Sequence, residues 1–266
     1  MNQYIKFLQK NYNDWNLMGY CEEAQKINNK IGDKYFCESN PHFFTGNLSA
    51  DLVLVHLNPK RNKNKVSGLY DVERPKFNSF EEYFDYFSYF GRYNYGENSE
   101  RTHKSRFDKK QIRFLKPLNI LPFSGNDIYK DLEIVMDNKL QIELIPFGSE
   151  NFNYNKVGIK NIEPFINNIL SLIAAKERKQ VIFCGRVFDD ILKEYVSKKK
   201  VHEFKLQKTD GTFTNGDYHF IEVEIKYNNN KVIKAVIAPQ YAMQGMPIEQ
   251  YGIKLNQLLN GKTNNK

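Results

Sequence analysis

Short apolar runs alternate with amphipathic segments along most of the chain. Three runs have the length of buried strands, and each is followed by a proline or a glycine: 51–57, 140–145 and 181–184. Four segments carry apolar residues at helical spacing: 127–136, 162–175, 187–196 and 248–259. Buried strands separated by helices predict an α/β fold with a largely parallel sheet.

The two ends of the chain have patterns of their own. Segments 219–227 and 231–238 alternate between apolar and polar residues around an Asn-rich turn, which predicts a β-hairpin. The first fifty residues have helical character, and we expect a helical N-terminal extension over 1–50.

The middle of the chain is rich in aromatic and basic residues. Ser79 begins a capping-box pattern, and the aromatic residues between Phe80 and Phe90 then recur at helical spacing, which favours a helix packed on the core over a ligand platform. Residues 92–110 are polar and basic, and form either an exposed loop or a strip that contacts phosphates.

Composition excludes several classes of protein. The 266 residues are 41% hydrophobic and 26% charged, which is too apolar for a disordered chain. No apolar run approaches the ~18–20 residues that a bilayer requires, so we expect no membrane association. Cys21, Cys37 and Cys184 have neither a disulfide nor a metal-ligand spacing, and the chain does not start like a signal peptide. We expect a cytoplasmic protein.

The net charge of +8 indicates an anionic partner, with nucleic acid the first candidate. The same excess would arise if the surface were simply rich in lysine, and the charge alone does not decide between the two.

Breakers follow three of the predicted strands, at Asn58–Pro59, at 146–148 and at Pro239. Ligands of open α/β sheets bind outside the carboxyl ends of the strands, so we expect these breakers to rim one cleft. His56 and Asn58 lie two residues apart and share a face of their strand. The Asn58 amide can hold a water or a base edge, or it can cap the turn before Pro59.

Four short motifs, in order, resemble those of the uracil-DNA glycosylase superfamily. Val53–Pro59 is similar to the first motif, in which a strand ends in Asp-Pro or Asn-Pro. Residues 144–147 lie where the family has its base-recognition strand. Residues 181–185 are similar to a hydrophobic strand that ends in glycine, and residues 239–259 are similar to the second motif and the helix that follows it. The resemblance implies a three-layer α/β/α fold with a central, mostly parallel four-stranded sheet. We expect a single domain over 1–266, with an insertion at 71–138.

The resemblance also implies roles for individual residues. Asn58 matches the residue that positions the attacking water, with His56 beside it on the strand. Pro59 matches the motif proline, and Tyr70 lies near the place of an aromatic ring that stacks on the flipped base. Four residues of the second motif are expected to bind DNA: Pro239, Gln240 as the residue that wedges into the duplex, Tyr241 and Gln244.

Several positions depart from the family pattern. Lys60 replaces the tyrosine that excludes 5-substituents, and the second-motif histidine is absent. The asparagine that reads uracil has no clear counterpart, because Pro146 and Phe147 occupy its place, and the cysteines of the iron–sulfur subfamilies are missing. These losses affect uracil specificity and the strongest rate-enhancing groups. We count Lys60 and Phe147 among the substrate-binding candidates.

Further candidates follow from their positions after the strands. Glu150 and Asn151 are possible base contacts. Ser149 either caps a turn or contacts a phosphate, and Arg186 either contacts a phosphate or begins a helix.

These residues predict an enzyme that hydrolyses the N-glycosidic bond of a flipped base and leaves an abasic site. The open position at Lys60 and the long insertion favour a bulky 5-modified pyrimidine, for example the hypermodified cytosine of phage DNA, and hence an anti-phage defence protein. We expect double-stranded or locally single-stranded DNA as partner, no cofactor or metal, and a monomer.

Two alternatives remain open. Asp217, Glu224 and Lys226 have the order of a metal-dependent nuclease site, although the same residues fit the solvated face of a strand. The chain could also be a non-catalytic nucleic-acid-binding module of the same fold.

Overall fold

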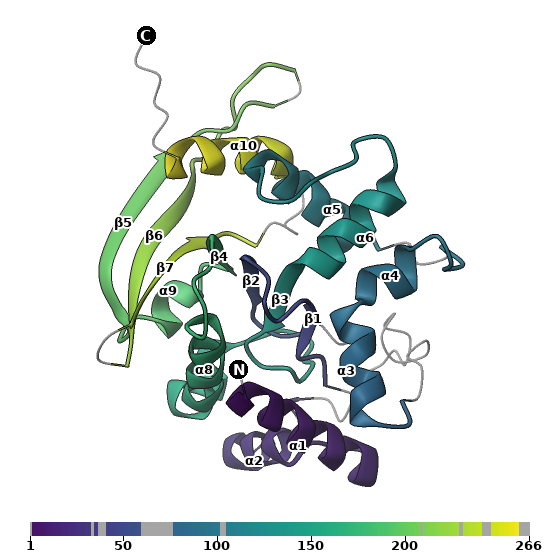
Figure 1. Ribbon diagram of the computed structural model, residues 1–266. Helices are drawn as coiled ribbons and strands as arrows, with labels where there is room; N and C mark the ends of the chain where they lie inside the picture. The colour runs from purple at the N-terminus through teal and green to yellow at the C-terminus, as the bar shows by residue number, and fades with distance from the viewer. Residues whose placement is uncertain are drawn as a thin grey trace.

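The computed structural model describes residues 2–32, 35–36, 41–59, 77–101, 105–208, 210–228, 231–240 and 246–260. It is an α/β protein built on one seven-stranded mixed sheet (Figure 1). The strands are β1 (Phe44–Gly46), β2 (Leu52–His56), β3 (Lys139–Glu143), β4 (Gln180–Cys184), β5 (Val196–Phe204), β6 (Tyr218–Tyr227) and β7 (Lys231–Ala238).

The centre of the sheet is parallel and its two edges are antiparallel. In the order β1-β3-β2-β4-β7-β6-β5, the strands β3, β2, β4 and β7 run in one direction. β1 pairs with β3 in the opposite direction, and β5 and β6 extend the other edge as antiparallel neighbours of β7. The predicted α/β class and the predicted hairpin are confirmed, but the expectation of a four-stranded sheet was wrong because three further strands join it.

The edge strand β5 shows why the sheet is larger than expected. Its residues are exposed or half-exposed, except for Phe204 at its end, so no buried face marks it in the sequence. We expected one helix over 187–196, but only α9 (Phe188–Ile191) forms, and β5 begins at Val196. Exposed lysines along an edge strand also discourage pairing with other chains.

Helices follow the strands and cover the sheet. They are α1 (Asn2–Met18), α2 (Glu22–Ile31), α3 (Phe80–Ser88), α4 (Phe90–Tyr95), α5 (Arg106–Leu115), the 3₁₀-helix η1 (Lys116–Leu118), α6 (Ile128–Asn138), α7 (Tyr154–Val157), α8 (Ile159–Ile173), α9 and α10 (Ile248–Leu259). The helices predicted at 127–136, 162–175 and 248–259 therefore form, with ends shifted by a few residues.

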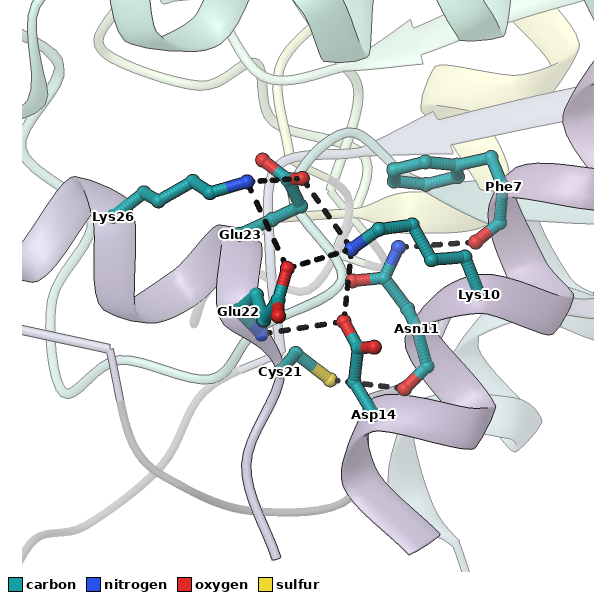
Figure 2. A network of polar contacts seen from close by, with 8 residues as sticks. All are labelled: Phe7, Lys10, Asn11, Asp14, Cys21, Glu22, Glu23 and Lys26. Atoms are coloured by element: carbon teal, nitrogen blue, oxygen red, sulfur yellow. Dashed lines mark hydrogen bonds and ion pairs between the residues drawn. The ribbon is translucent and has the colours of Figure 1, made fainter. Parts of the chain in front are cut away.

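The first fifty residues pack closely on the rest of the chain. Tyr4, Leu8 and Tyr12 of α1 are buried in the core, and 44–46 form strand β1 rather than continuing the helical region that we expected. Figure 2 shows the polar network at the α1–α2 junction, where the Lys10 ammonium lies 3.0 Å from the Asp14 carboxylate and 3.3 Å from that of Glu22. Such exposed ion pairs add little stability, so burial of the α1 side chains holds this region in place.

The described part of the 71–138 segment supplies helices α3 to α6 beside β1 and β3 (Figure 1). Ser79 caps α3, accepting a hydrogen bond from the Glu82 backbone at 3.2 Å, and Tyr83 and Phe87 are fully buried, which confirms the packed aromatic stripe. Residues 106–110 begin α5, so that part of the basic segment is helical rather than a loop. Within the described residues, no helix has the length and apolar character needed to cross a membrane.

Candidate functional site

A cleft of about 720 Å³ lies at the carboxyl ends of three parallel strands. Leu57, Gly185 and Pro239, which follow β2, β4 and β7, line it. From β2 the chain moves toward the β1 edge to form β3, and from β4 it moves toward the β5 edge to form β7. The strand order therefore reverses direction between β2 and β4. Open α/β sheets bind their ligands at this kind of position.

Of the three strand breakers that we expected around one cleft, only Pro239 is among the described residues that line it. Asn58 and Pro59 directly follow the cleft residue Leu57 but do not line the cleft themselves. The breaker at 146–148, after β3, does not line the cleft either, and its Phe147 carbonyl contacts Asn58 instead. This third breaker therefore supports the Asn58 side chain rather than the cleft wall.

The segment between β5 and β6 forms the opposite wall, and sequence reasoning missed it. This segment folds back on itself, with the Lys208 amide donating to the Thr212 carbonyl at 2.7 Å and the Thr214 amide to the Leu206 carbonyl at 2.8 Å. The sequence signal for this turn is Asp210-Gly211, and in the structure Gly211 adopts a φ of +83°. Its position over the cleft depends on long-range packing that the local pattern does not reveal. The residues that it contributes to the lining are Lys208, Thr214, Asn215, Gly216 and Asp217, and Tyr218 at the start of β6 follows them.

Two cations and two aromatic rings give the cleft its chemical character. The cations are Arg186 and Lys208, and the rings are those of Phe152 and Tyr218; one acid, Asp217, also lines the cleft. This combination suits a polyanion that carries flat bases, because cations attract phosphates and aromatic faces stack on bases.

The Arg186 guanidinium is also fixed from the β6 side. It lies 3.0 Å from Nδ1 of His219, and since a guanidinium only donates, this nitrogen accepts. Burial, with the Arg186 charge, lowers the pKa of His219 and keeps its ring neutral.

Asn58 is half-buried at the end of β2, and its amide nitrogen is firmly held. Nδ2 donates to the Ser149 hydroxyl at 2.8 Å and to the Phe147 carbonyl at 3.2 Å, with the Pro59 carbonyl at 3.3 Å. Carbonyl oxygens only accept, so the amide cannot be turned the other way. Its Oδ1 has no partner among the described residues, and is the group that remains to hold a ligand or a water.

The residues after β3 support Asn58 with their backbone. Ser149 is buried, and its amide donates to the Pro59 carbonyl at 3.1 Å. The Phe147 ring packs in the core against Phe165 at 5.9 Å, so its carbonyl rather than its ring reaches Asn58.

The other base-contact candidates in this segment are more open. Glu150 is half-exposed, and the Asn151 side chain is exposed. The Tyr35 hydroxyl holds the Asn151 carbonyl at 2.5 Å, so the backbone is fixed there while the side chain points outward.

His56 is buried below Asn58, and its ring lies 5.5 Å from that of Phe107 in an edge-on contact. Burial, together with the charge of Lys139, lowers the pKa of His56 to about 3. The ring is therefore neutral near pH 7 and lacks the second, acidic N–H proton of an imidazolium.

Of the remaining candidates, Pro239 and Gln240 line the cleft. Lys60, Tyr70, Tyr241 and Gln244 lie outside the described residues.

A row of buried polar side chains on β3 is the feature that sequence reasoning overlooked. Lys139, Gln141 and Glu143 occupy alternate positions and are all buried. The signal was present as the alternation in Lys-Leu-Gln-Ile-Glu, since a central parallel strand is ordinarily apolar on both faces.

The residues of the possible nuclease site are spread along β6. Asp217 precedes the strand and Glu224 follows seven residues later, a span of roughly 23 Å at strand rise. The Glu224 carboxylate pairs with Lys198 at 3.0 Å. In the described ranges, no three His, Cys, Asp or Glu side chains are grouped as metal ligands.

No family model matches this chain, and no curated protein is similar enough to it to count as a match. The resemblance to the uracil-DNA glycosylase superfamily therefore rests on its motifs.

Proposed function

We propose that this protein is a monofunctional DNA glycosylase that hydrolyses the N-glycosidic bond of a modified base flipped out of DNA. The observation that carries the proposal is the Asn58 amide next to the cleft residue Leu57. Its nitrogen is fixed by three acceptors, and its oxygen has no partner among the described residues. A fixed acceptor of this kind can orient a water for attack.

In the proposed reaction, Asn58 Oδ1 accepts one hydrogen of a water and directs its oxygen at the anomeric carbon. The bond from this carbon to the base nitrogen breaks, and its electron pair leaves with the base. An amide cannot take the water proton near pH 7, so the proton passes to solvent and catalysis relies on positioning and electrostatics. We therefore expect a slow enzyme, or one whose base leaves readily.

The cleft would hold the DNA strand around the flipped nucleotide. Arg186 and Lys208 supply phosphate affinity that does not depend on sequence, and Tyr218 and Phe152 offer faces for stacking. Pro239 and Gln240 line the same cleft and would contact the strand where the base has left the stack.

The proposal extends to the fold and the biological setting. It includes a three-layer α/β/α arrangement, a bulky 5-modified pyrimidine such as a hypermodified cytosine as substrate, and a role in phage defence in the cytoplasm. The choice of a bulky 5-modified pyrimidine rests on the lysine at position 60 and on the long insertion before β3.

One assay separates this proposal from both alternatives. Duplexes with single modified pyrimidines are incubated with the protein either in EDTA or with Mg²⁺, then analysed with and without hot alkali. A glycosylase yields breaks only after alkali, and the Asn58→Ala variant loses this activity but still binds the DNA. Breaks that need a divalent metal and no alkali would establish a nuclease, and binding without any chemistry would establish a non-catalytic module.

A further inference from the structure

The buried row on β3 runs toward the proposed site. Lys139, Gln141 and Glu143 share a face because they are two residues apart, and their exposed fractions are 0%, 6% and 7%. His56 is the β2 partner of Glu143 in the parallel register, so Asn58 lies on the same face two residues further along. Strand spacings place the Cα atoms of Asn58 and Glu143 roughly 8 Å apart.

Hydrogen bonds set the orientation of the Gln141 amide in this row and of the Gln111 amide beside it. The Lys139 ammonium donates to Gln141 Oε1 at 2.6 Å, and Gln111 Nε2 donates to the same oxygen at 2.8 Å. Because the ammonium has no acceptor, Gln141 must turn its nitrogen the other way, and Nε2 donates to Glu143 Oε1 at 3.3 Å. Glu143 therefore uses Oε1 to accept from Gln141, and Oε2 takes no part in the row's hydrogen bonds.

Glu143 Oε2 is buried and has no hydrogen-bond partner among the described residues. Buried carboxylate oxygens are almost always satisfied, because leaving one without a donor is costly. The open acceptor stands at the last residue of β3, at the same end of the sheet as Asn58 Oδ1. Both groups call for a donor that the described chain does not supply.

We propose that Glu143 reads the flipped base by accepting a hydrogen bond from its exocyclic amino group, which makes the substrate a cytosine-type base rather than a uracil-type one. This inference rests on the proposed glycosylase function. Cytosine carries an N4 amino donor where uracil carries the O4 acceptor, and a carboxylate accepts from that amino group. A substituent at position 5 leaves this edge unchanged.

The charges around Glu143 make this preference depend on pH. Burial raises the pKa of Glu143 to about 7, against the opposing effects of the Gln141 hydrogen bond and the Lys139 charge. Tyr4 and Cys184 are the other titratable groups that interact with it, and burial raises the pKa of both, so they are neutral near pH 7. His56 is neutral there as well. Burial lowers the pKa of Lys139 to about 8, so Lys139 loses charge only at the upper end of the range from pH 6 to pH 8. Glu143 gains charge over that range, and its preference for an amino donor should strengthen with it.

The test uses two duplexes that differ in one base, 5-hydroxymethylcytosine against 5-hydroxymethyluracil. These bases carry the same 5-substituent and differ at position 4 and in the hydrogen on N3. Single-turnover release of each base is measured for the wild type, for Glu143→Gln and for the control Glu224→Gln, which changes a carboxylate at the distant Lys198 pair. We expect the wild type to prefer the cytosine duplex by roughly 10- to 150-fold, the range for a hydrogen bond to a charged group. The control keeps this ratio.

Glu143→Gln should reverse the preference. Gln141 Nε2 holds the new amide oxygen in the place of Oε1, so the new NH₂ group replaces Oε2 and donates to O4 of the uracil duplex. A Glu143→Gln variant that folds and keeps the wild-type ratio overturns the inference while leaving the glycosylase proposal intact.

A second measurement needs no variant. The wild-type ratio is followed from pH 6 to pH 8, and we expect it to rise, whereas a ratio that is flat or falls contradicts the role of Glu143. If the wild type releases neither base nor any other modified pyrimidine, the proposed function fails and the inference fails with it.

Discussion

Asn58→Asp replaces the amide with a carboxyl group of nearly the same shape, and we expect it to destabilise the protein. The amide nitrogen donates to the Phe147 carbonyl at 3.2 Å and to the Pro59 carbonyl at 3.3 Å, and a carboxylate oxygen in its place has no hydrogen to offer. Ser149 can turn its hydroxyl to donate instead, so one of the three contacts survives. The Pro59 carbonyl keeps the Ser149 amide as a donor, so the Phe147 carbonyl is the acceptor that loses its donor among the described residues. Leaving such an acceptor unpaired costs about 1–3 kcal/mol, or roughly 2–12 °C in melting temperature for a chain of this size.

The loss should depend on pH with a definite sign. Two facing carbonyl oxygens disfavour the charged form of the introduced carboxyl, so its folded-state pKa is raised above the ordinary value of about 3.9. The folded form then binds more protons than the unfolded form above that value, and the stability of the variant falls as the pH rises through the raised pKa. The deficit is therefore largest near pH 7.5 and smallest near pH 4.

Thermal unfolding at the two pH values checks this reasoning. Asn151→Asp is the matched control, because the same chemical change at an exposed side chain should alter stability by at most about 0.5 kcal/mol. An Asn58→Asp variant that melts with the wild type at pH 7.5 would show that the amide is not held by the carbonyl groups. We also expect base release to fall in this variant.

Three further predictions concern the cleft and the buried row. Arg186→Ala should weaken DNA binding about equally for all sequences and reduce the slope of log affinity against log salt by about one, so an unchanged slope in salt titrations would exclude a phosphate contact. Tyr218→Ala should weaken binding of single-stranded DNA by roughly 1–3 kcal/mol if its ring stacks on a base, as measured by fluorescence anisotropy. Burial lowers the pKa of Lys139 to about 8, below its unfolded value, so the unfolded chain binds more protons than the folded one between about pH 8 and 10.5. Lys139 therefore makes the free energy of unfolding rise by about 3 kcal/mol over that pH range. Denaturant titrations at pH 7.5 and 10.5 should show this increment in the wild type relative to Lys139→Met, and equal changes in both proteins would refute it.

The elements that sequence patterns identified are those whose buried positions follow a regular pattern along the chain. β2 and β4 are continuous apolar runs closed by breakers, and α10 has one apolar face, so local pattern and tertiary environment agree. β5 gave no such signal, because its side chains are exposed and only pairing with β6 makes it a strand. β1 has three residues, too few for a periodicity to be read.

The site was predictable only as far as local chemistry reached. The place of Asn58 at a strand end follows from Asn-Pro after an apolar run. Its orientation depends on Phe147 and Ser149, which lie 89 and 91 residues away in the sequence. Glu143 carried a readable signal as a polar residue on a central strand, but the open Oε2 arises from Gln111 and Lys139 together, and this requires the packed structure.

Mass spectrometry of the free bases released from DNA carrying different modified pyrimidines tests the central claim most directly. With the wild-type protein in EDTA, we predict release of an intact 5-modified cytosine base and formation of one abasic site per base released, and no release by Asn58→Ala. Equal release by Asn58→Ala, or no free base from any of these DNAs, would contradict the account.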